Sequence, residues 1–179
     1  ALFGDSLMSG YGLNNEFHLS TVLEKNLKNQ GFDVKIINAS VSGDTTTGGL
    51  NRLNWLLENT KIDIVILCLG ANDMLRGTNP DLIKQNLNKI LERLSKRNIK
   101  VLLAGMLSQE TYGKKYKKNF DEIYPELAKK HKVTFIPFLL KGVALNPSYN
   151  LDDGKHPNAE GVKLISKNLE KKLINLLLN

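Results

Sequence analysis

Apolar residues along the chain form two alternating patterns, short continuous runs and longer amphipathic stretches. The runs predict strands at residues 2–4, 34–38, 62–69, 101–106 and 133–137. Apolar positions at helical spacing predict helices at residues 19–30, 46–58, 80–97, 114–130 and 158–177. Uninterrupted apolar strands that alternate with helices are typical of a parallel sheet covered on both faces. The pattern therefore predicts one α/β domain over residues 1–179, a three-layer α/β/α sandwich with about five parallel strands.

Four polar segments lie where predicted strands end or beyond the last of them. They are residues 4–7 (Gly-Asp-Ser-Leu), 38–45 (Asn-Ala-Ser-Val-Ser-Gly-Asp-Thr), 70–73 (Gly-Ala-Asn-Asp) and 153–156 (Asp-Gly-Lys-His). The carboxyl ends of parallel strands share one edge, and open α/β sheets bind their ligands there. We therefore expect the four segments to meet at that edge.

Ser6 and His156 are a candidate nucleophile and its base. A serine hydroxyl is unreactive until a base takes its proton, and a histidine oriented by a carboxylate is the usual base. Asp153 precedes His156 by three residues, so one loop could supply both groups, although the neighbouring Asp152 could orient His156 instead. Asp5 is expected to hold the turn before Ser6 through backbone hydrogen bonds, and Ser6 could also be only a helix N-cap. With its companion segments, the set predicts a serine hydrolase.

Acyl transfer also needs hydrogen-bond donors for the negative charge that grows on the carbonyl oxygen. Gly43 can present its backbone N–H with no side chain in the way, and Asn72 can supply its amide. The backbone N–H of Ser6 would be a third donor. Asn72 could instead only cap its loop, whereas Asp44 and Asp73 are expected to brace the loops without taking part in the chemistry.

The four segments, in this order through essentially the whole chain, resemble the GDSL, or SGNH, hydrolase family. Its four named residues correspond here to Ser6, Gly43, Asn72 and His156. Further matches, such as Leu-Arg-Gly at residues 75–77, are similar to the bacterial branch of multifunctional thioesterases, also described as lysophospholipases and arylesterases. The resemblance implies a flavodoxin-like fold, no metal and no organic cofactor.

The resemblance also implies an enzyme that hydrolyses carboxylic esters or thioesters through an acyl-enzyme intermediate. Short or medium acyl esters, aryl esters and lysophospholipids are the substrate classes that we expect. The side chains expected to line an acyl groove are Leu75, Leu107, Tyr112, Leu145 and Pro147. A carbohydrate O-acetylesterase of the same superfamily is the alternative enzyme, and a non-catalytic flavodoxin-like binding module is the alternative outside enzymes.

The chain departs from that bacterial branch at two places. Ala71 stands where the branch usually has glycine, and we expect it to change only the stiffness of its loop. Residues 107–110 read Leu-Ser-Gln-Glu where relatives carry a Leu-Pro pair. Because this stretch borders the expected acyl groove, we expect it to alter the chain-length preference.

The composition of the chain excludes several classes of protein. The chain has 179 residues, of which 41% are hydrophobic and 24% charged, as in an ordinary globular domain. No apolar run approaches the roughly 18–20 residues that span a bilayer, so we expect no stable membrane insertion. The single cysteine, Cys68, excludes an intrachain disulfide and any multi-cysteine metal site. We expect Cys68 and Trp55 to be buried in the core.

The formal net charge of +7 raises the question of a nucleic-acid partner. The lysines are spread over most predicted helices, with no aromatic-rich binding module and no basic tail, so we expect solvated helix faces instead. A small or lipid-like ester is the expected partner, and an attraction to anionic substrates is compatible with the charge. No pattern indicates an oligomeric state.

Residues 1–3 resemble the second half of a strand, so we expect that the natural protein does not start here. Either a targeting segment has been removed or preceding residues are left out, and no signal peptide is present in the sequence itself. By analogy with the bacterial branch, we expect the periplasm or secretion, with a cytoplasmic location left open.

Overall fold

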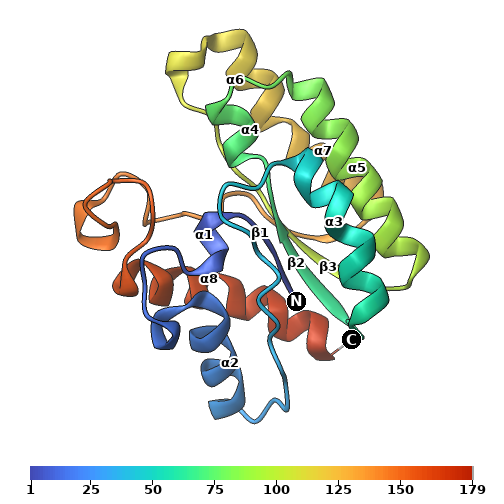
Figure 1. Cartoon of the computed structure of the whole chain (residues 1–179), viewed down its shortest axis with the longest axis vertical. Coiled ribbons are helices and arrows are strands. Elements are labelled where there is room, and N and C mark those ends of the chain that lie inside the picture. Colours follow the sequence, from blue (N-terminus) through green and yellow to red (C-terminus); the bar gives the residue numbers. More distant parts are fainter. Residues whose placement is uncertain (179) are drawn as a thin grey trace.

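A parallel sheet lies between two layers of helices in the computed structural model, which describes residues 1–178 (Figure 1). Its strands are β1 (Leu2–Gly4), β2 (Ile64–Cys68), β3 (Lys100–Ala104) and β4 (Thr134–Ile136), paired in that order and all parallel. The register places Gly4 beside Cys68 and Ala104 beside Ile136, so the strands end together at one edge. The predicted parallel α/β sandwich is confirmed.

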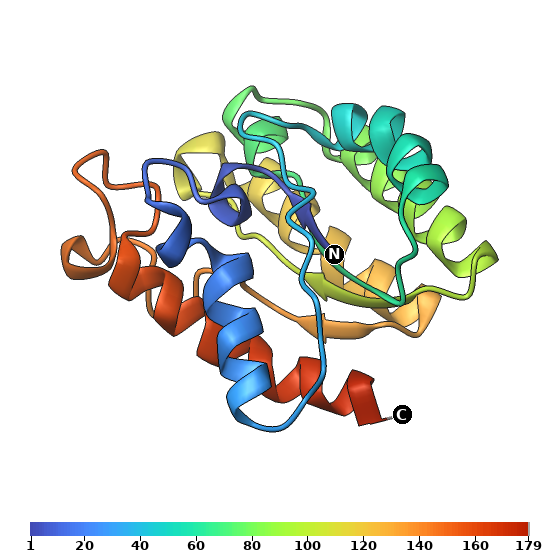
Figure 2. The same cartoon turned by 60° about the horizontal axis from the view of Figure 1, so that its bottom comes forward.

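The two helical layers are clearly separated when the molecule is turned (Figure 2). One face carries α2 (Leu19–Asn29) and α8 (Ala159–Leu178), and the other carries α3 (Thr46–Asn59), α5 (Pro80–Lys96) and α7 (Ile123–His131). The shorter elements are α1 (Ser6–Ser9), α4 (Ala71–Leu75), α6 (Lys114–Asp121), η1 (Asn15–Phe17), η2 (Glu110–Tyr112) and η3 (Pro147–Tyr149). Of these, α1 and α4 directly follow the carboxyl ends of β1 and β2, so they start at the edge that was expected to hold the site.

The core is built from the apolar runs and stripes that the sequence shows. Cys68 is buried, as predicted. In the predicted helix at residues 80–97, Leu82 is exposed, and the buried apolar residues are Ile83, Leu87, Ile90, Leu91 and Leu94. Within residues 1–178, no helix combines the length and the apolar character that crossing a membrane requires.

The segment at residues 34–38 is not the fifth regular strand that the sequence predicted. It meets β1 through a single parallel bridge between Leu2 and Asn38. The N–H of Leu2 donates to the carbonyl of Ile37 (2.8 Å), and the N–H of Ala39 donates to the carbonyl of Leu2 (2.9 Å). The carbonyl of Ala39, which would continue a ladder with β1, instead accepts a hydrogen bond from the side chain of Arg52 (2.5 Å). The segment still runs along this edge of the sheet.

The predicted helix at residues 114–130 is two helices, α6 and α7, with a break at Glu122. Pro125 lies in the first turn of α7 and has no N–H, so it cannot donate the helical hydrogen bond to the carbonyl of Asp121. The amphipathic spacing continues through the break, which is why the two helices read as one.

Trp55 is not in the core, contrary to the sequence-based expectation, because its side chain is 70% exposed. The helix α3 buries Leu53, Leu56 and Leu57, which share one face at helical spacing. Trp55 lies on the opposite face of that helix, and a large apolar side chain there meets solvent.

Candidate active site

The turn between β1 and α1 places Ser6 just beyond the carboxyl end of β1. Asp5 is the N-cap of α1, and its Oδ1 accepts a hydrogen bond from the N–H of Leu7 (3.0 Å), as expected for a residue that holds the turn. Gly4 permits the close packing behind it, because a Cβ there would lie 2.6 Å from the carbonyl oxygen of Cys68. Ser6 is therefore fixed at the carboxyl edge of the sheet.

His156 reaches Ser6 from the loop between η3 and α8. Its Nε2 lies 2.9 Å from the Oγ of Ser6, across 150 positions of sequence. Its Nδ1 lies 2.5 Å from Oδ2 of Asp153. An ionised carboxylate can only accept, so Nδ1 carries the proton and Nε2 of the neutral ring is free to accept from the Ser6 hydroxyl. Asp153, rather than Asp152, makes this contact.

The carboxylate of Asp153 is held by the loop that carries it. Its Oδ1 accepts hydrogen bonds from the backbone N–H groups of Lys155 (2.8 Å) and His156 (2.9 Å). The backbone and side-chain hydrogen bonds from His156, followed by that from Lys155, hold the pKa of Asp153 well below its usual range. The group facing the imidazole is therefore an anion.

Tyr11 is a site residue that the sequence reasoning missed. Its ring packs against that of His156, with the centroids 4.3 Å apart and the planes at 35°. The tyrosine is half exposed, so it covers the imidazole from the solvent side. The signal available in the sequence was its place between two glycines, Gly10 and Gly12, close after Ser6. Both glycines have positive φ in the structure.

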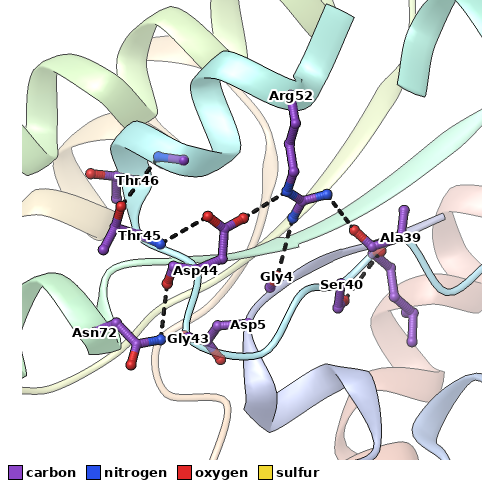
Figure 3. Close-up of polar contacts among 12 residues, drawn as sticks. Gly4, Asp5, Ala39, Ser40, Gly43, Asp44, Thr45, Thr46, Arg52 and Asn72 are labelled. Carbon is purple, nitrogen blue, oxygen red and sulfur yellow. Dashed lines mark hydrogen bonds and ion pairs between the residues drawn. The ribbon is translucent and has the colours of Figure 1, made fainter. Parts of the chain in front are cut away.

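Of the three expected oxyanion donors, the N–H of Ser6 lies at the start of α1, and the other two come from different elements. Gly43 precedes α3 with φ of 80°, and a Cβ at this position would meet nothing within 4 Å, so the space beside it is open. Asn72 lies on α4, and its Nδ2 donates to the carbonyl of Asp44 (2.9 Å) and faces Oδ2 of Asp5 at 3.4 Å (Figure 3). Their action as donors to an oxyanion stays a prediction.

The acidic residues around Asn72 are structural in the way expected. Asp73 accepts from both the N–H and the hydroxyl of Thr46, at 2.8 and 2.7 Å, and so holds the first turn of α3. Asp44 accepts from the N–H of Thr45 and from Arg52. Asp5 is almost wholly buried, and this burial raises its pKa to about 6.

Of the five candidate acyl-contact residues, Leu75 ends α4, Tyr112 ends η2 and Pro147 begins η3, whereas Leu107 and Leu145 lie in connecting segments. Leu75 and Leu107 are about half exposed, Pro147 is exposed, and Tyr112 packs its ring 5.5 Å from that of Tyr116. Leu145 is 89% exposed and has φ of 62°, a left-handed conformation that is strained for a leucine. Their contact with substrate also stays a prediction. No group of three or more histidine, cysteine or acidic side chains in residues 1–178 is arranged to hold a metal ion.

Comparison with known proteins agrees with this geometry. The sequence profile of the GDSL-like lipase/acylhydrolase family matches residues 2–164. An arylesterase of Vibrio mimicus is 38% identical over 98% of this chain and 88% of its own length. Thioesterase 1/protease 1/lysophospholipase L1 of Escherichia coli is 36% identical over 96% of this chain and 81% of its own. The structure of the psychrotrophic esterase EstA from Pseudoalteromonas, inhibited by monoethylphosphonate, superposes with a TM-score of 0.93 at 29% identity, covering 99% and 97% of the two chains.

Proposed function

The chain belongs to the GDSL-like lipase/acylhydrolase family and hydrolyses carboxylic esters or thioesters, and from this premise we propose how its own residues perform the reaction. Ser6 is the nucleophile, His156 is the general base and then the general acid, and Asp153 orients His156. The observation that carries this proposal is the continuous contact from Ser6 Oγ to His156 (2.9 Å) and on to Asp153 (2.5 Å).

Acylation begins when Nε2 of His156 takes the hydroxyl proton as Oγ of Ser6 attacks the carbonyl carbon. The new C–O bond moves the carbonyl electron pair onto oxygen. The N–H groups of Ser6 and Gly43 and the amide of Asn72 then donate to this oxyanion. One amide hydrogen of Asn72 is held by the carbonyl of Asp44, and the other makes a long hydrogen bond of 3.4 Å to Oδ2 of Asp5, which it would exchange for the oxyanion. Each such donor is worth roughly 100- to 1,000-fold in rate.

The tetrahedral intermediate collapses when the imidazolium of His156 protonates the leaving alcohol or thiol. The acyl group stays on Ser6 until His156 takes a proton from water, which attacks the same carbon and releases the acid. Asp153 remains ionised, since its pKa is lowered by its hydrogen bonds, and its charge stabilises the imidazolium in both steps.

The mechanism is tested by removing the nucleophile. Ser6→Ala is expected to lose at least about 1,000-fold in kcat on p-nitrophenyl esters and to take up no fluorescent phosphonate, a reagent class suggested by the phosphonate-inhibited EstA. Ser95→Ala, an exposed serine on α5, is the matched control and should be labelled and active like the parent. Undiminished hydrolysis by Ser6→Ala would reject the proposal.

The substrate that we propose is a small or lipid-like ester with a short or medium acyl chain or an aryl leaving group. Support comes from the exposed apolar side chains at the site and from the relatives named arylesterase and lysophospholipase. We propose no nucleic-acid partner and no stable insertion into a membrane. A series of acyl chain lengths on one chromophore should peak on aliphatic or aryl esters. A peak on acetylated sugars, with no activity on fatty acyl esters, would favour the carbohydrate O-acetylesterase instead.

For location, we propose the bacterial periplasm or secretion, by analogy with the branch that the motifs resemble. Fractionation of cells that express the whole gene product should find the esterase outside the cytoplasm. Recovery of the activity in the cytoplasmic fraction would contradict this.

A further inference from the structure

Arg52 on α3 uses all three nitrogens of its guanidinium on other parts of the chain (Figure 3). Its Nε donates to Oδ2 of Asp44 (2.6 Å), and its two terminal nitrogens donate to the carbonyls of Ala39 (2.5 Å) and Gly4 (3.2 Å). Its Cζ also lies 4.0 Å from the centre of the Phe3 ring, which is the geometry of a cation–π contact. The triad does not use this residue, and no sequence motif pointed to it.

Arg52 joins two segments that carry groups of the reaction, residues 4–7 and residues 38–45. Gly4 ends β1 two residues before Ser6. Ala39 lies just beyond the bridge between the edge segment and β1. Asp44 follows Gly43 directly, and its backbone carbonyl accepts the amide of Asn72 (2.9 Å). One side chain therefore links the nucleophile strand to the loop that carries Gly43 and, through the carbonyl of Asp44, to Asn72 on α4.

The surroundings make this link rigid. The carboxylate of Asp44 is only 8% exposed, and Arg52 is 25% exposed, so water competes weakly for their contact. The other carboxylate oxygen of Asp44, Oδ1, accepts a hydrogen bond from the N–H of Thr45 (3.0 Å). Gly48 leaves room for the carboxylate, because a Cβ there would lie 2.0 Å from Oδ1 of Asp44. A planar fork of donors matches three fixed acceptors in a way that a lysine ammonium cannot.

We propose that Arg52 is a positioning residue for the oxyanion hole, which acts through Asp44 to set the Gly43 N–H and the Asn72 amide at bonding distance from the oxyanion. It does not touch the substrate. The inference rests on the proposed function, since it presumes that Gly43 and Asn72 serve as donors. Arg52 is expected to matter for the rate of the chemical step and little for ground-state binding.

Kinetics of Arg52→Ala and Arg52→Lys test the inference, with Arg97→Ala as the matched control. Arg97 also holds α3, by a single 2.8 Å bond from α5 to the carbonyl of Leu57, but it lies at the other end of that helix. We expect Arg52→Ala to lower kcat by about 100-fold, the effect of roughly 1 Å of misplacement, with KM within about twofold. The pH profile should keep its shape, because Ser6 and His156 are untouched. Added guanidinium should restore part of the lost kcat in Arg52→Ala. It should leave the kcat of the parent unchanged.

The contrary outcome is a variant that unfolds at lower temperature but keeps the parent kcat when folded, as Arg97→Ala should. That result would make Arg52 a structural residue only. Arg52→Lys keeps the positive charge and replaces Arg52→Ala in the test if the alanine variant does not fold. If Arg52→Lys has the kcat of the parent and added guanidinium does not change it, the inference is also overturned. Failure of the proposed function is distinguishable, since it would leave Ser6→Ala active, whereas failure of this inference leaves Ser6→Ala inactive and the Arg52 variants active.

Discussion

Two carboxylates near Ser6 are held in opposite electrostatic conditions. Hydrogen bonds from His156 and Lys155 keep the pKa of Asp153 well below its usual range. Burial raises the pKa of Asp5 to about 6, against its one backbone hydrogen bond from Leu7. Asp153 therefore favours the ionised form, whereas an ionised Asp5 is unfavourable in the folded protein. Residues that cost stability beside a nucleophile are typical of functional sites.

Replacing Asp153 by asparagine should lower kcat by about 100- to 10,000-fold. The amide cannot stabilise an imidazolium, and it favours the wrong histidine tautomer. Asp152→Asn is the matched control, because the carboxylate of Asp152 is exposed and Asp153, not Asp152, is hydrogen-bonded to His156. Steady-state kinetics on a p-nitrophenyl ester decide the matter, and equal losses in the two variants would refute the assignment of Asp153.

Asp5→Asn should stabilise the protein at neutral pH. The folded pKa of about 6 exceeds the ordinary 3.8, so between these values the folded protein binds more protons than the unfolded chain. The contribution of Asp5 to the free energy of unfolding therefore falls as pH rises through this window. At pH 7 it is lower by roughly 3 kcal/mol than at a pH below both pKa values. Urea unfolding of both proteins should show the asparagine variant more stable at pH 7 and the two nearly equal near pH 4. A less stable variant at pH 7 would mean that the hydrogen bonds of the carboxylate outweigh its burial.

Among the elements, the first turn of α3 has the largest influence on the site. Thr45 caps it by accepting the N–H of Gly48 (3.2 Å), and Asp73 places a negative charge at its N-terminus. Such a charge is favourable there because the unpaired N–H groups of a helix start are electropositive. The first turn of α3 thus connects α4, which carries Asn72, to the loop that carries Gly43. Asp73 of α4 makes this connection through its hydrogen bonds with Thr46.

Gly48→Ala should break the usual rule that alanine stabilises a helix relative to glycine by roughly 0.5–1 kcal/mol. The new Cβ would lie 2.0 Å from Oδ1 of Asp44, whose carboxylate is held by Arg52 and Thr45. Relieving this clash should lower stability by about 1–3 kcal/mol and reduce kcat, as measured by thermal unfolding and steady-state kinetics. Asn51→Ala, at an exposed position of the same helix, should leave kcat unchanged. A higher melting temperature with full activity for Gly48→Ala would contradict the expectation.

For the whole molecule, the net charge of +7 acts over distances that no single contact covers. Exposed lysines on α6, among them Lys114, Lys115 and Lys118, follow the loop that contains Leu107. A surplus of positive charge raises the local concentration of anionic ligands and falls off with added salt. The charge is thus expected to affect the rate of substrate encounter and not the chemistry itself.

Raising the ionic strength should lower kcat/KM for an anionic aryl ester by about three- to tenfold and leave a neutral aryl ester of the same acyl group nearly unchanged. Measurement of both esters between low salt and about 300 mM salt separates attraction from general salt effects. The same slope for both esters would show that the net charge has no role in encounter.

The sequence by itself determined the local structure and the chemical groups. Apolar runs and helical spacing need only neighbouring residues, so they predicted the four strands and both helical layers. The spacing of Asp153 and His156 is similarly local, since one tight loop supplies carboxylate, backbone donors and imidazole. The order of the motifs along parallel strands was enough to place Ser6 and His156 at one edge.

Only the tertiary structure decided which distant groups touch. The break at Glu122, the exposure of Trp55 and the single bridge at Asn38 each depend on how an element meets its neighbours. The packing of Tyr11 on His156 and the three contacts of Arg52 depend on directions set by backbones that are far apart in sequence. A sequence pattern records which side of an element is apolar, but the distance between two polar atoms is set only when the whole core has packed.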